Sequence, residues 1–230
     1  MRENTLVIIP ARAGSKGLKG KNKKIIQGLP LVEHSIRFAT EHFDPKNIVV
    51  STDDPYILKL TRVYEIASKE LRPDKLSGPT AKTIDVVKFE LEQFNGAEID
   101  TVLLLQPTSP LRKHSDIPAI QKLLESGKTK SVVSVSKVDE PHPYKMLRKD
   151  LSGNLVPLIE NCTDTPRQCL PKCYQLAGMY YWISVKTLLE AKSFLPLDSL
   201  PFEIPSERAV NINNILDFYL CERLFQDHEF

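Results

Sequence analysis

The segment that most constrains the fold runs from Leu6 to Asn22, with the sequence LVIIPARAGSKGLKGKN. A short apolar run ends in a proline and passes directly into a loop that carries three glycines interleaved with basic residues. Glycines let backbone N–H groups approach and surround an anion, and the cations neutralise it. The segment matches neither G-x-G-x-x-G nor G-x-x-x-x-G-K-S/T, the two common phosphate fingerprints. Two interpretations are therefore open, a strand that feeds a phosphate-binding loop and a solvated basic turn.

The charge and hydropathy of the chain exclude several classes of protein. The 230 residues include 31 basic and 29 acidic side chains, a net charge of +2, which argues against nucleic acid as a partner. The basic residues are locally concentrated, because five of the nine residues from Lys16 to Lys24 are lysine. A local patch with a near-neutral total fits a small polyanion. No apolar run approaches the roughly 20 residues that cross a bilayer, so we expect a cytoplasmic protein that does not contact membranes.

Short apolar runs alternate with segments of helical periodicity along most of the chain. This alternation predicts an α/β fold with a mainly parallel, Rossmann-like sheet flanked by helices. Strands are predicted at 6–9, 47–51, 101–105, 131–135 and 174–183, and helices at 31–43, 55–65, 81–94, 116–126, 184–192 and 214–225. In the last helix, the spacing predicts an inward face formed by Leu216, Tyr219, Leu220 and Leu224.

The predicted strand order suggests where a ligand binds and where the chain departs from the fold. Ligands of parallel sheets bind beyond the carboxyl ends of the strands, so the loops after Ile9, Ser51 and Leu105 should meet at one edge. From 139 to 173 prolines recur and no helical period is visible, which predicts an irregular insertion with a short hairpin around Gly153. We interpret 139–173 as a dimerisation segment inserted into a single domain that spans residues 1–230.

The cysteines do not indicate a metal site or a disulfide framework. The four cysteines form no C-x-x-C pair, and no histidine cluster lies near them in the sequence: Cys162, Cys169, Cys173 and Cys221. We therefore expect reduced thiols and no structural zinc.

Five further motifs follow the glycine-bearing loop in a fixed order. They are STDD (51–54), ELRPDKL (70–76), QPTSPLR (106–112), RQCLPKCYQLAGMYYW (167–182) and ERAVNINNILDFYLCE (207–222). Together with IPARAGSKG, these motifs closely resemble the CMP–N-acylneuraminate (CMP–sialic acid) synthetases, or acylneuraminate cytidylyltransferases, and their relatives acting on other nonulosonic acids. The resemblance covers nearly the whole chain. It implies a nucleotidyltransferase-type fold, a homodimer, and transfer of CMP from CTP to a sugar acid with release of pyrophosphate and with Mg²⁺ as cofactor.

The resemblance also implies a nucleotide site built around the first loop. Arg12 and Lys21 correspond to catalytic cations that neutralise the triphosphate, and an arginine fork can bind phosphate through two hydrogen bonds. The corresponding nucleotide-binding residues are Ala11, Arg12, Ala13, Gly14, Ser15, Lys16, Gly17, Lys21, Asn22, Arg72 and Thr83. Of these, Asn22, Arg72 and Thr83 match positions that contact the cytidine. From the residues alone, Arg72 is equally compatible with a helix cap or a surface ion pair.

A second set of residues corresponds to the sugar-acid site of the family. The members of this set are Gln106, Lys145, Arg167, Tyr181 and Phe194. The resemblance implies that Lys145 and Arg167 pair with the carboxylate of the sugar acid, across the dimer interface. The two aromatic residues would line the sugar pocket, but their apolar surroundings in the sequence are also compatible with a role in core packing.

One departure from the family pattern concerns the metal. The family's D-I-D motif supplies carboxylates to Mg²⁺, and the corresponding residues here are Asn211 and Asn213. An amide is neutral, whereas Mg²⁺ prefers anionic oxygen ligands. Three explanations stay open: the triphosphate holds the metal with Asn213 or a water filling the site, Asp217 contributes a carboxylate, or the chain binds nucleotide without efficient turnover. Asp217 is equally compatible with an ordinary helix carboxylate, which is the interpretation we favour.

The sequence leaves two classes of function. The first is a Mg²⁺-dependent cytidylyltransferase for a nonulosonic acid, of the legionaminic or pseudaminic acid branch, with CTP as the other substrate. The second is a catalytically weak nucleotide-binding homologue that acts as a scaffold. Within the enzyme class, a 3-deoxy-manno-octulosonate cytidylyltransferase is the alternative, but the long R-Q-x-L-P insertion fits the acylneuraminate branch better. The retained Arg12, Lys21, Gln106 and Arg167 favour the enzyme.

Overall fold

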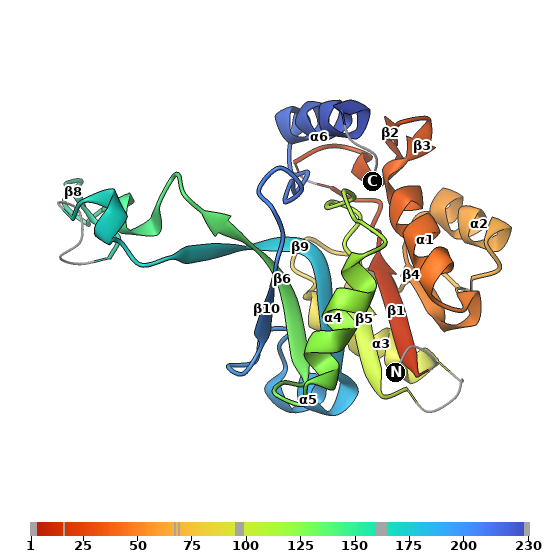
Figure 1. Cartoon of the computed structure of the whole chain (residues 1–230). Coiled ribbons are helices and arrows are strands. Elements are labelled where there is room, and N and C mark those ends of the chain that lie inside the picture. Colours follow the sequence, from red (N-terminus) through yellow and green to blue (C-terminus); the bar gives the residue numbers. More distant parts are fainter. Residues whose placement is uncertain are drawn as a thin grey trace.

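The chain forms a helix-covered sheet from which an arm projects (Figure 1). The computed structural model describes residues 4–15, 17–66, 68, 70–94, 99–159 and 165–227. The strands are β1 (Thr5–Pro10), β2 (Ile25–Ile26), β3 (Leu29–Pro30), β4 (Ile48–Ser51), β5 (Thr101–Leu104), β6 (Ser131–Val138), β7 (Leu147–Lys149), β8 (Leu155–Pro157), β9 (Cys173–Ser184) and β10 (Leu200–Glu203). The α-helices are α1 (Leu31–His42), α2 (Pro55–Val63), α3 (Thr83–Gln93), α4 (Asp116–Glu125), α5 (Val185–Ala191) and α6 (Ile215–Asp227). None of the helices in the described ranges is both long and apolar enough to span a bilayer.

The large sheet is mixed and mainly parallel, with the strand order β10-β6-β9-β5-β1-β4. Strand β1 runs parallel to β4 and β5, and β10 runs parallel to β6. Strand β9 is antiparallel to both of its neighbours, β5 and β6. The predicted α/β class is therefore confirmed, and the strand predicted to return after the insertion is the antiparallel one. Strand β10 was not predicted, because its four residues, LPFE, are too few for a period to show.

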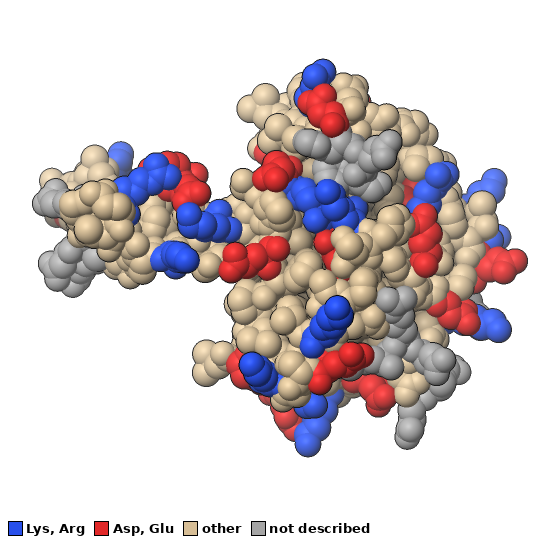
Figure 2. All heavy atoms as spheres, viewed as in Figure 1, with Lys and Arg blue, Asp and Glu red and all other residues tan. Residues whose placement is uncertain are grey.

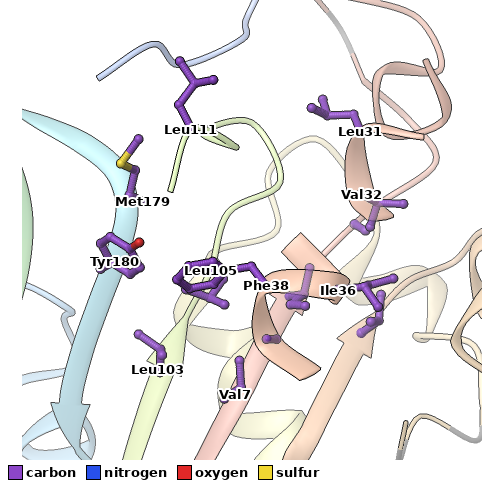
Figure 3. Close-up of a cluster of buried hydrophobic side chains, with 14 of the residues drawn as sticks. Val7, Leu31, Val32, Ile36, Phe38, Leu103, Leu105, Leu111, Met179 and Tyr180 are labelled. Atoms are coloured by element: carbon purple, nitrogen blue, oxygen red, sulfur yellow. The ribbon is translucent and has the colours of Figure 1, made fainter. Parts of the chain in front are cut away.

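The apolar strands are buried because helices cover both faces of the sheet. Along β1, Val7 and Ile9 point into the larger core under α1, α2, α4 and α6, whereas Leu6 and Ile8 point into the smaller core under α3 and α5. All four side chains are fully buried. Figure 3 shows part of the larger core, where side chains from α1, β5, β9 and the loop after β5 point toward one another. A strand buried on both faces has no polar alternation, which explains the continuous apolar run in the sequence.

Helix α2 begins with a side-chain cap. The side chain of Asp54 accepts a hydrogen bond from the backbone N–H of Tyr56 at 2.9 Å, and Pro55 occupies the first helical turn. This arrangement satisfies one of the backbone donors that a helix leaves free at its N-terminus. The helix therefore begins directly after the short loop that follows β4.

The inward face predicted for α6 is wrong. Three of the four residues predicted to face inward are more than half exposed: Leu216, Tyr219 and Leu220. The buried positions are instead Phe218 and Cys221, with Leu224 packed partly against the core. Apolar side chains occur on both sides of this helix, so helical periodicity alone does not determine which side meets the sheet.

The insertion forms an arm that leaves and re-enters the sheet through paired strands. The outer parts of β6 and β9 pair as far as Val138 and Cys173. Beyond them, β7 and β8 form an antiparallel hairpin whose turn contains Gly153 at φ 87°. The predicted hairpin is therefore confirmed. Residues 160–164, which include Cys162, lie outside the described residues.

A fully buried arginine anchors the loop after β5. The guanidinium of Arg112 donates hydrogen bonds to the backbone oxygens of Gln106 (2.8 Å) and Met179 (3.2 and 3.3 Å) and to Ser35 Oγ (2.9 Å). The guanidinium carbon, Cζ, also lies 5.7 Å from the ring centroid of Tyr180. Burial lowers the pKa of Arg112 to about 10. One side chain thus joins the loop, β9 and α1.

A buried ion pair extends this connection to the segment before α6. Asp116, at the start of α4, accepts a hydrogen bond from the Tyr180 hydroxyl at 2.8 Å and forms a salt bridge with Arg208. Arg208 also donates to the backbone oxygen of Leu111 at 3.2 Å. Burial raises the pKa of Tyr180 well above its ordinary value. We refer to Arg112, Asp116, Tyr180 and Arg208 as the buried network.

We predict that Asp116→Ala lowers the free energy of unfolding by about 3–5 kcal/mol, because it leaves the Arg208 charge buried without its partner. Urea denaturation followed by circular dichroism measures this change. Asp227→Ala is the matched control, because it breaks the exposed pair between Arg223 and Asp227 on α6 and should cost only a small fraction of that energy. Equal losses in the two variants would show that burial does not determine the strength of the Asp116 pair.

Candidate active site

A cavity of about 400 Å³ lies at the edge of the sheet where β1 and β5 end. The loop after β1 contributes Arg12 and Lys21, and the loop after β5 contributes Gln106. Nine of the residues predicted from the sequence line this cavity: Arg12, Ser15, Lys21, Asn22, Arg72, Thr83, Gln106, Asn211 and Asn213. The structure thus gathers residues as far apart in the sequence as Arg12 and Asn213 into one site.

The loop after β1 is attached to the loop after β4. The N–H of Ala11 donates to the backbone oxygen of Ser51 at 2.8 Å, and Thr52 Oγ1 donates to the backbone oxygen of Ala11 at 2.7 Å. The N–H of Ala13 donates to Asp53 Oδ1 at 2.7 Å. The expectation that these loops meet at one edge is therefore confirmed. The N–H of Ala13, a residue predicted to bind the nucleotide, thus donates to a carboxylate in this conformation.

One glycine of the loop, Gly17, permits a close contact with the segment before α6. A Cβ atom on Gly17 would lie 2.1 Å from the backbone oxygen of Asn213, so only glycine fits there. In contrast, a Cβ on Gly14 would meet nothing within 4 Å. The segment 211–213 is thus packed directly against the loop. Lys16, between these glycines, lies outside the described residues.

Two cations of the loop are held in place by backbone oxygens. Lys21 Nζ donates to the backbone oxygen of Ile212 at 2.6 Å, and Arg12 Nη1 donates to that of Gly78 at 3.0 Å. Asn22 Nδ2 in turn donates to the backbone oxygen of Arg12 at 3.0 Å. Burial lowers the pKa of Lys21, and the nearby charge of Arg12 lowers it further. Both cations border the cavity while their backbone contacts fix their positions.

Arg72 is buried at the cavity wall with part of its guanidinium free. Its backbone N–H donates to the oxygen of Thr52 at 2.7 Å, and its Nε donates to Ser77 Oγ at 3.3 Å. Its Nη2 is buried and finds no hydrogen-bond acceptor in the described part of the chain, with Asp53 Oδ1 at 3.8 Å. Burial lowers the pKa of Arg72. An unsatisfied buried donor is costly, so this nitrogen is available for an acceptor on a ligand. A surface ion pair is not compatible with this burial.

The Gln106 side of the cavity contains buried polar atoms around a glycine. Gly178 lies on β9 at φ 73°, and a Cβ there would be 2.7 Å from Ser109 Oγ and 2.9 Å from Gln106 Oε1. Ser109 Oγ and Asn211 Oδ1 are buried without a hydrogen-bond partner among the described residues. Glycine therefore keeps open a polar space beside Gln106, and the unsatisfied atoms indicate that a polar ligand group or water belongs there.

Lys145 and Arg167 lie on the arm and do not border this cavity. Lys145 ends the short 3₁₀ helix Pro143–Lys145, and Arg167 starts another, Arg167–Cys169. Arg167 lines a second cavity of about 430 Å³ together with Lys137, His142 and Lys172. Figure 2 shows Lys and Arg side chains along the arm, with Asp and Glu side chains beside them on the arm and at its junction with the body. Within one protomer, these two residues are not part of the Gln106 site.

Tyr181 and Phe194 were predicted to line the sugar pocket, but the structure places them in the core. Their rings contact each other edge to face with centroids 5.9 Å apart, in the smaller hydrophobic cluster under α3 and α5. Tyr181 follows Tyr180 on β9, and successive residues of a strand point to opposite faces. Because Tyr180 points into the larger core, Tyr181 points away from it, to the face that α3 and α5 cover. Both residues are packing residues here.

Sequence reasoning missed residues that position the site. Arg112 fixes the backbone of Gln106, Asp53 fixes that of Ala13, and Gly178 leaves space beside Gln106. A signal was present for all three, because each belongs to one of the motifs QPTSPLR, STDD and RQCLPKCYQLAGMYYW. Nothing in a motif, however, tells which of its polar residues face the ligand and which face the backbone.

The donor set at the segment 211–213 does not fit a magnesium ion held by the protein. In the described ranges, no group of three or more His, Cys, Asp or Glu side chains is placed to hold a metal. Asp217 Oδ2 accepts hydrogen bonds from the N–H groups of Asn213 (2.7 Å) and Asn214 (3.0 Å), as a helix-capping carboxylate does. Asn211 and Asn213 offer only neutral amide oxygens, whereas Mg²⁺ is ordinarily held through carboxylates and phosphates.

Comparison with known proteins decides the family. A family profile described as "Cytidylyltransferase" matches residues 6–149, which is more than half of the chain. The chain belongs to this cytidylyltransferase family. The matched region contains the loop after β1, the loop after β5 and Arg112, so the family match includes most of the cavity described above.

Individual cytidylyltransferases resemble the chain over nearly all of its length. It is 35% identical to the CMP-N,N'-diacetyllegionaminic acid synthase of Legionella pneumophila, over 96% of each chain. It is 31% identical to an N-acylneuraminate cytidylyltransferase of Streptococcus agalactiae, in an alignment that includes 97% of this chain but 54% of that relative. Identity to the pseudaminic acid cytidylyltransferase of Campylobacter jejuni is 26%, over 97% of each. The chain thus spans about half the length of the streptococcal relative.

A solved structure shares the fold. The CMP:2-keto-3-deoxy-manno-octonic acid synthetase complexed with CTP superposes on the chain with a TM-score of 0.67, covering 97% of this chain and 98% of that one. The sequence identity is 16%, so this likeness concerns the fold alone.

We predict that Gly17→Ala lowers the free energy of unfolding by about 1–3 kcal/mol, because the added methyl group must displace the Asn213 carbonyl. Gly14→Ala is the matched control in the same loop, and its added methyl group meets open space, so its effect should stay within about 0.5 kcal/mol. Urea denaturation of both variants measures the difference. Equal stabilities would show that segment 211–213 does not pack against the loop as described.

Proposed function

We propose that this cytidylyltransferase-family chain activates a nonulosonic acid with CTP, forming the CMP-sugar and pyrophosphate. The observation that carries the proposal is the cavity where Arg12, Lys21 and Arg72 meet Gln106 at the ends of β1 and β5. The cations Arg12 and Lys21 suit a polyphosphate, and the polar space around Gln106 and Gly178 suits a hydroxylated sugar. The match to a legionaminic acid relative over 96% of both chains supports the same reaction.

The proposed chemistry is an in-line attack of the sugar's anomeric hydroxyl oxygen on the α-phosphorus of CTP, with pyrophosphate leaving on the opposite side. Such transfers depend on positioning and on neutralising charge on the phosphate oxygens. Arg12 and Lys21 would supply that charge, and hydrogen bonds to backbone oxygens hold both at the cavity. Asn22, Arg72 and Thr83 would contact the cytidine, and Gln106 would orient the sugar acid.

The family resemblance also implies Mg²⁺ as a cofactor, but the neutral donors at 211 and 213 do not fit an ion held by the chain. The steps assigned here therefore use the chain's own side chains. The same neutral donors favour the second candidate, a nucleotide-binding homologue with weak catalysis. Among sugar acids, the 35% identity to the legionaminic acid relative against 26% to the pseudaminic acid relative favours a legionaminic acid type of substrate.

We further propose that the arm is a dimerisation segment of the nucleotidyltransferase-type domain. It carries exposed apolar side chains that a single protomer does not cover: Leu147, Leu151, Leu155 and Leu158. Exposed apolar groups gathered on one projection are typical of a protein interface. A second copy of the chain would cover them, and it would bring Lys145 and Arg167 to the sugar carboxylate at the neighbouring site.

A direct test is pyrophosphate release from CTP with a panel of nonulosonic acids and Mg²⁺. We expect release with at least one acid, fastest with one of the legionaminic acid type. Arg12→Ala should abolish CTP binding in calorimetry and leave the circular dichroism spectrum unchanged, because it removes a guanidinium from the cavity. Lys19→Ala is the matched control, since Lys19 is exposed in the same loop outside the cavity lining. Absence of release with every acid would refute the enzyme, and CTP binding that persisted would then favour the scaffold.

If the arm forms the proposed dimer, one substitution on the arm should halve the mass of the protein in solution. Leu151→Asp should shift the protein from the mass of a dimer to that of a monomer in light scattering after gel filtration, because it places a charge in an apolar interface. Leu197→Asp is the matched control, as Leu197 is equally exposed, at 109%, but lies outside the arm. A wild-type protein with the mass of a monomer would contradict the dimer.

A further inference from the structure

Three cations border the cavity, and the carboxylate of Asp53, which is not among the lining residues, lies within ion-pair distance of one of them, Arg72. Arg12, Lys21 and Arg72 all border it, and among the described lining residues there is no aspartate or glutamate. Like charges gathered in a cavity repel each other and raise the free energy of the empty site. The pKa of Lys21 is lowered partly by Arg12, which is consistent with this repulsion. A polyanion that enters the cavity relieves the repulsion directly.

The carboxylates behind the lining are engaged by backbone groups. Asp53 accepts the N–H of Ala13 and lies 3.8 Å from the Arg72 guanidinium. Asp217 accepts two backbone N–H groups at the start of α6. Each of these carboxylates therefore serves the chain itself, and turning either one toward a metal would remove the acceptor of the Ala13 N–H or of the two N–H groups at the start of α6.

The residues that face the phosphate region from the segment before α6 are neutral. Asn213 is exposed and donates from its Nδ2 to the backbone oxygen of Asn211 at 3.3 Å. Asn211 Oδ1 is buried without a partner in the described part of the structure. A neutral amide adds no negative charge beside Lys21, which contacts the backbone of this segment, so neither asparagine competes with phosphate for that cation.

We propose that this site binds the triphosphate of CTP through its own cations, without a divalent metal ion, so that metal-free CTP binds at least as tightly as the magnesium complex. The inference rests on the proposed function, because it takes CTP as the ligand. The reason is the charge of the described cavity lining, which contains three cations and no carboxylate. A metal ion bridges carboxylates of a protein to phosphate, and this described lining has no carboxylate to bridge. Mg²⁺ on the phosphates would instead reduce their charge and weaken their attraction to Arg12, Lys21 and Arg72.

Calorimetry of CTP with the wild-type protein, once in EDTA and once with excess Mg²⁺, tests the proposal. We expect CTP to bind in EDTA with a Kd no larger than that in Mg²⁺. Binding that is detected only with Mg²⁺, or that tightens about tenfold or more on adding it, would overturn the inference and leave the proposed function standing. Absence of CTP binding in both conditions would refute the proposed function and the inference with it.

A charge variant and a matched control sharpen the test. Asn213→Asp places a carboxylate in the cavity lining, so it should weaken CTP binding in EDTA about tenfold, and Mg²⁺ should restore the loss. Asn214→Asp adds the same charge one residue later, where the side chain caps α6 by accepting the N–H groups of Leu216 and Asp217. Aspartate caps equally well there, and CTP binding should change less than about threefold in either condition. Equal effects of the two variants, or an Asn213→Asp protein that binds as the wild type does in EDTA, would contradict the proposal.

Discussion

The buried pair between Asp116 and Arg208 ties together parts of the chain that would otherwise be independent. It connects the start of α4 to the segment that leads into α6, and Tyr180 extends the connection to β9. Arg112 then joins the backbone of Gln106 to the same strand. Buried charges are costly unless they are fully paired, so each of these groups tolerates few alternative arrangements. The position of the cavity wall follows from that restriction.

The loop after β1 has a different kind of support. Its backbone is held by hydrogen bonds to the loop after β4, and Gly17 allows the segment 211–213 to pack against it. Lys21 completes this contact by donating to the backbone of Ile212. The side chain that would meet a phosphate is therefore also the one that fixes the segment carrying the neutral asparagines. The same loop therefore contains glycine, which permits close packing, and a lysine whose hydrogen bond fixes the packed segment.

Much of the fold could be predicted because the strong signals are local. The run before the glycine loop, the cap at Asp54 and the hairpin at Gly153 each depend on a few neighbouring residues, and all three agree with the structure. The prediction of the inward face of α6 was wrong because both sides of that helix carry apolar residues. Only tertiary contacts determine which side packs against the core. The prediction that Tyr181 lines the cavity was wrong because a motif gives the position of a residue along a strand but not the face of the sheet to which its side chain points. For the site, the sequence identified the cations, whereas the groups that orient them became visible only in three dimensions.

The arm leaves and rejoins the body through two neighbouring strands, β6 and β9, that are paired on both sides of the junction. A change in the length of the hairpin beyond that junction alters neither the register of the sheet nor the spacing of Gly178 and Tyr180 on β9. Evolution can therefore lengthen, shorten or recompose the projection while the nucleotide end of the molecule stays constant. The reach of the arm and the geometry of the nucleotide end are, in this architecture, free to vary independently.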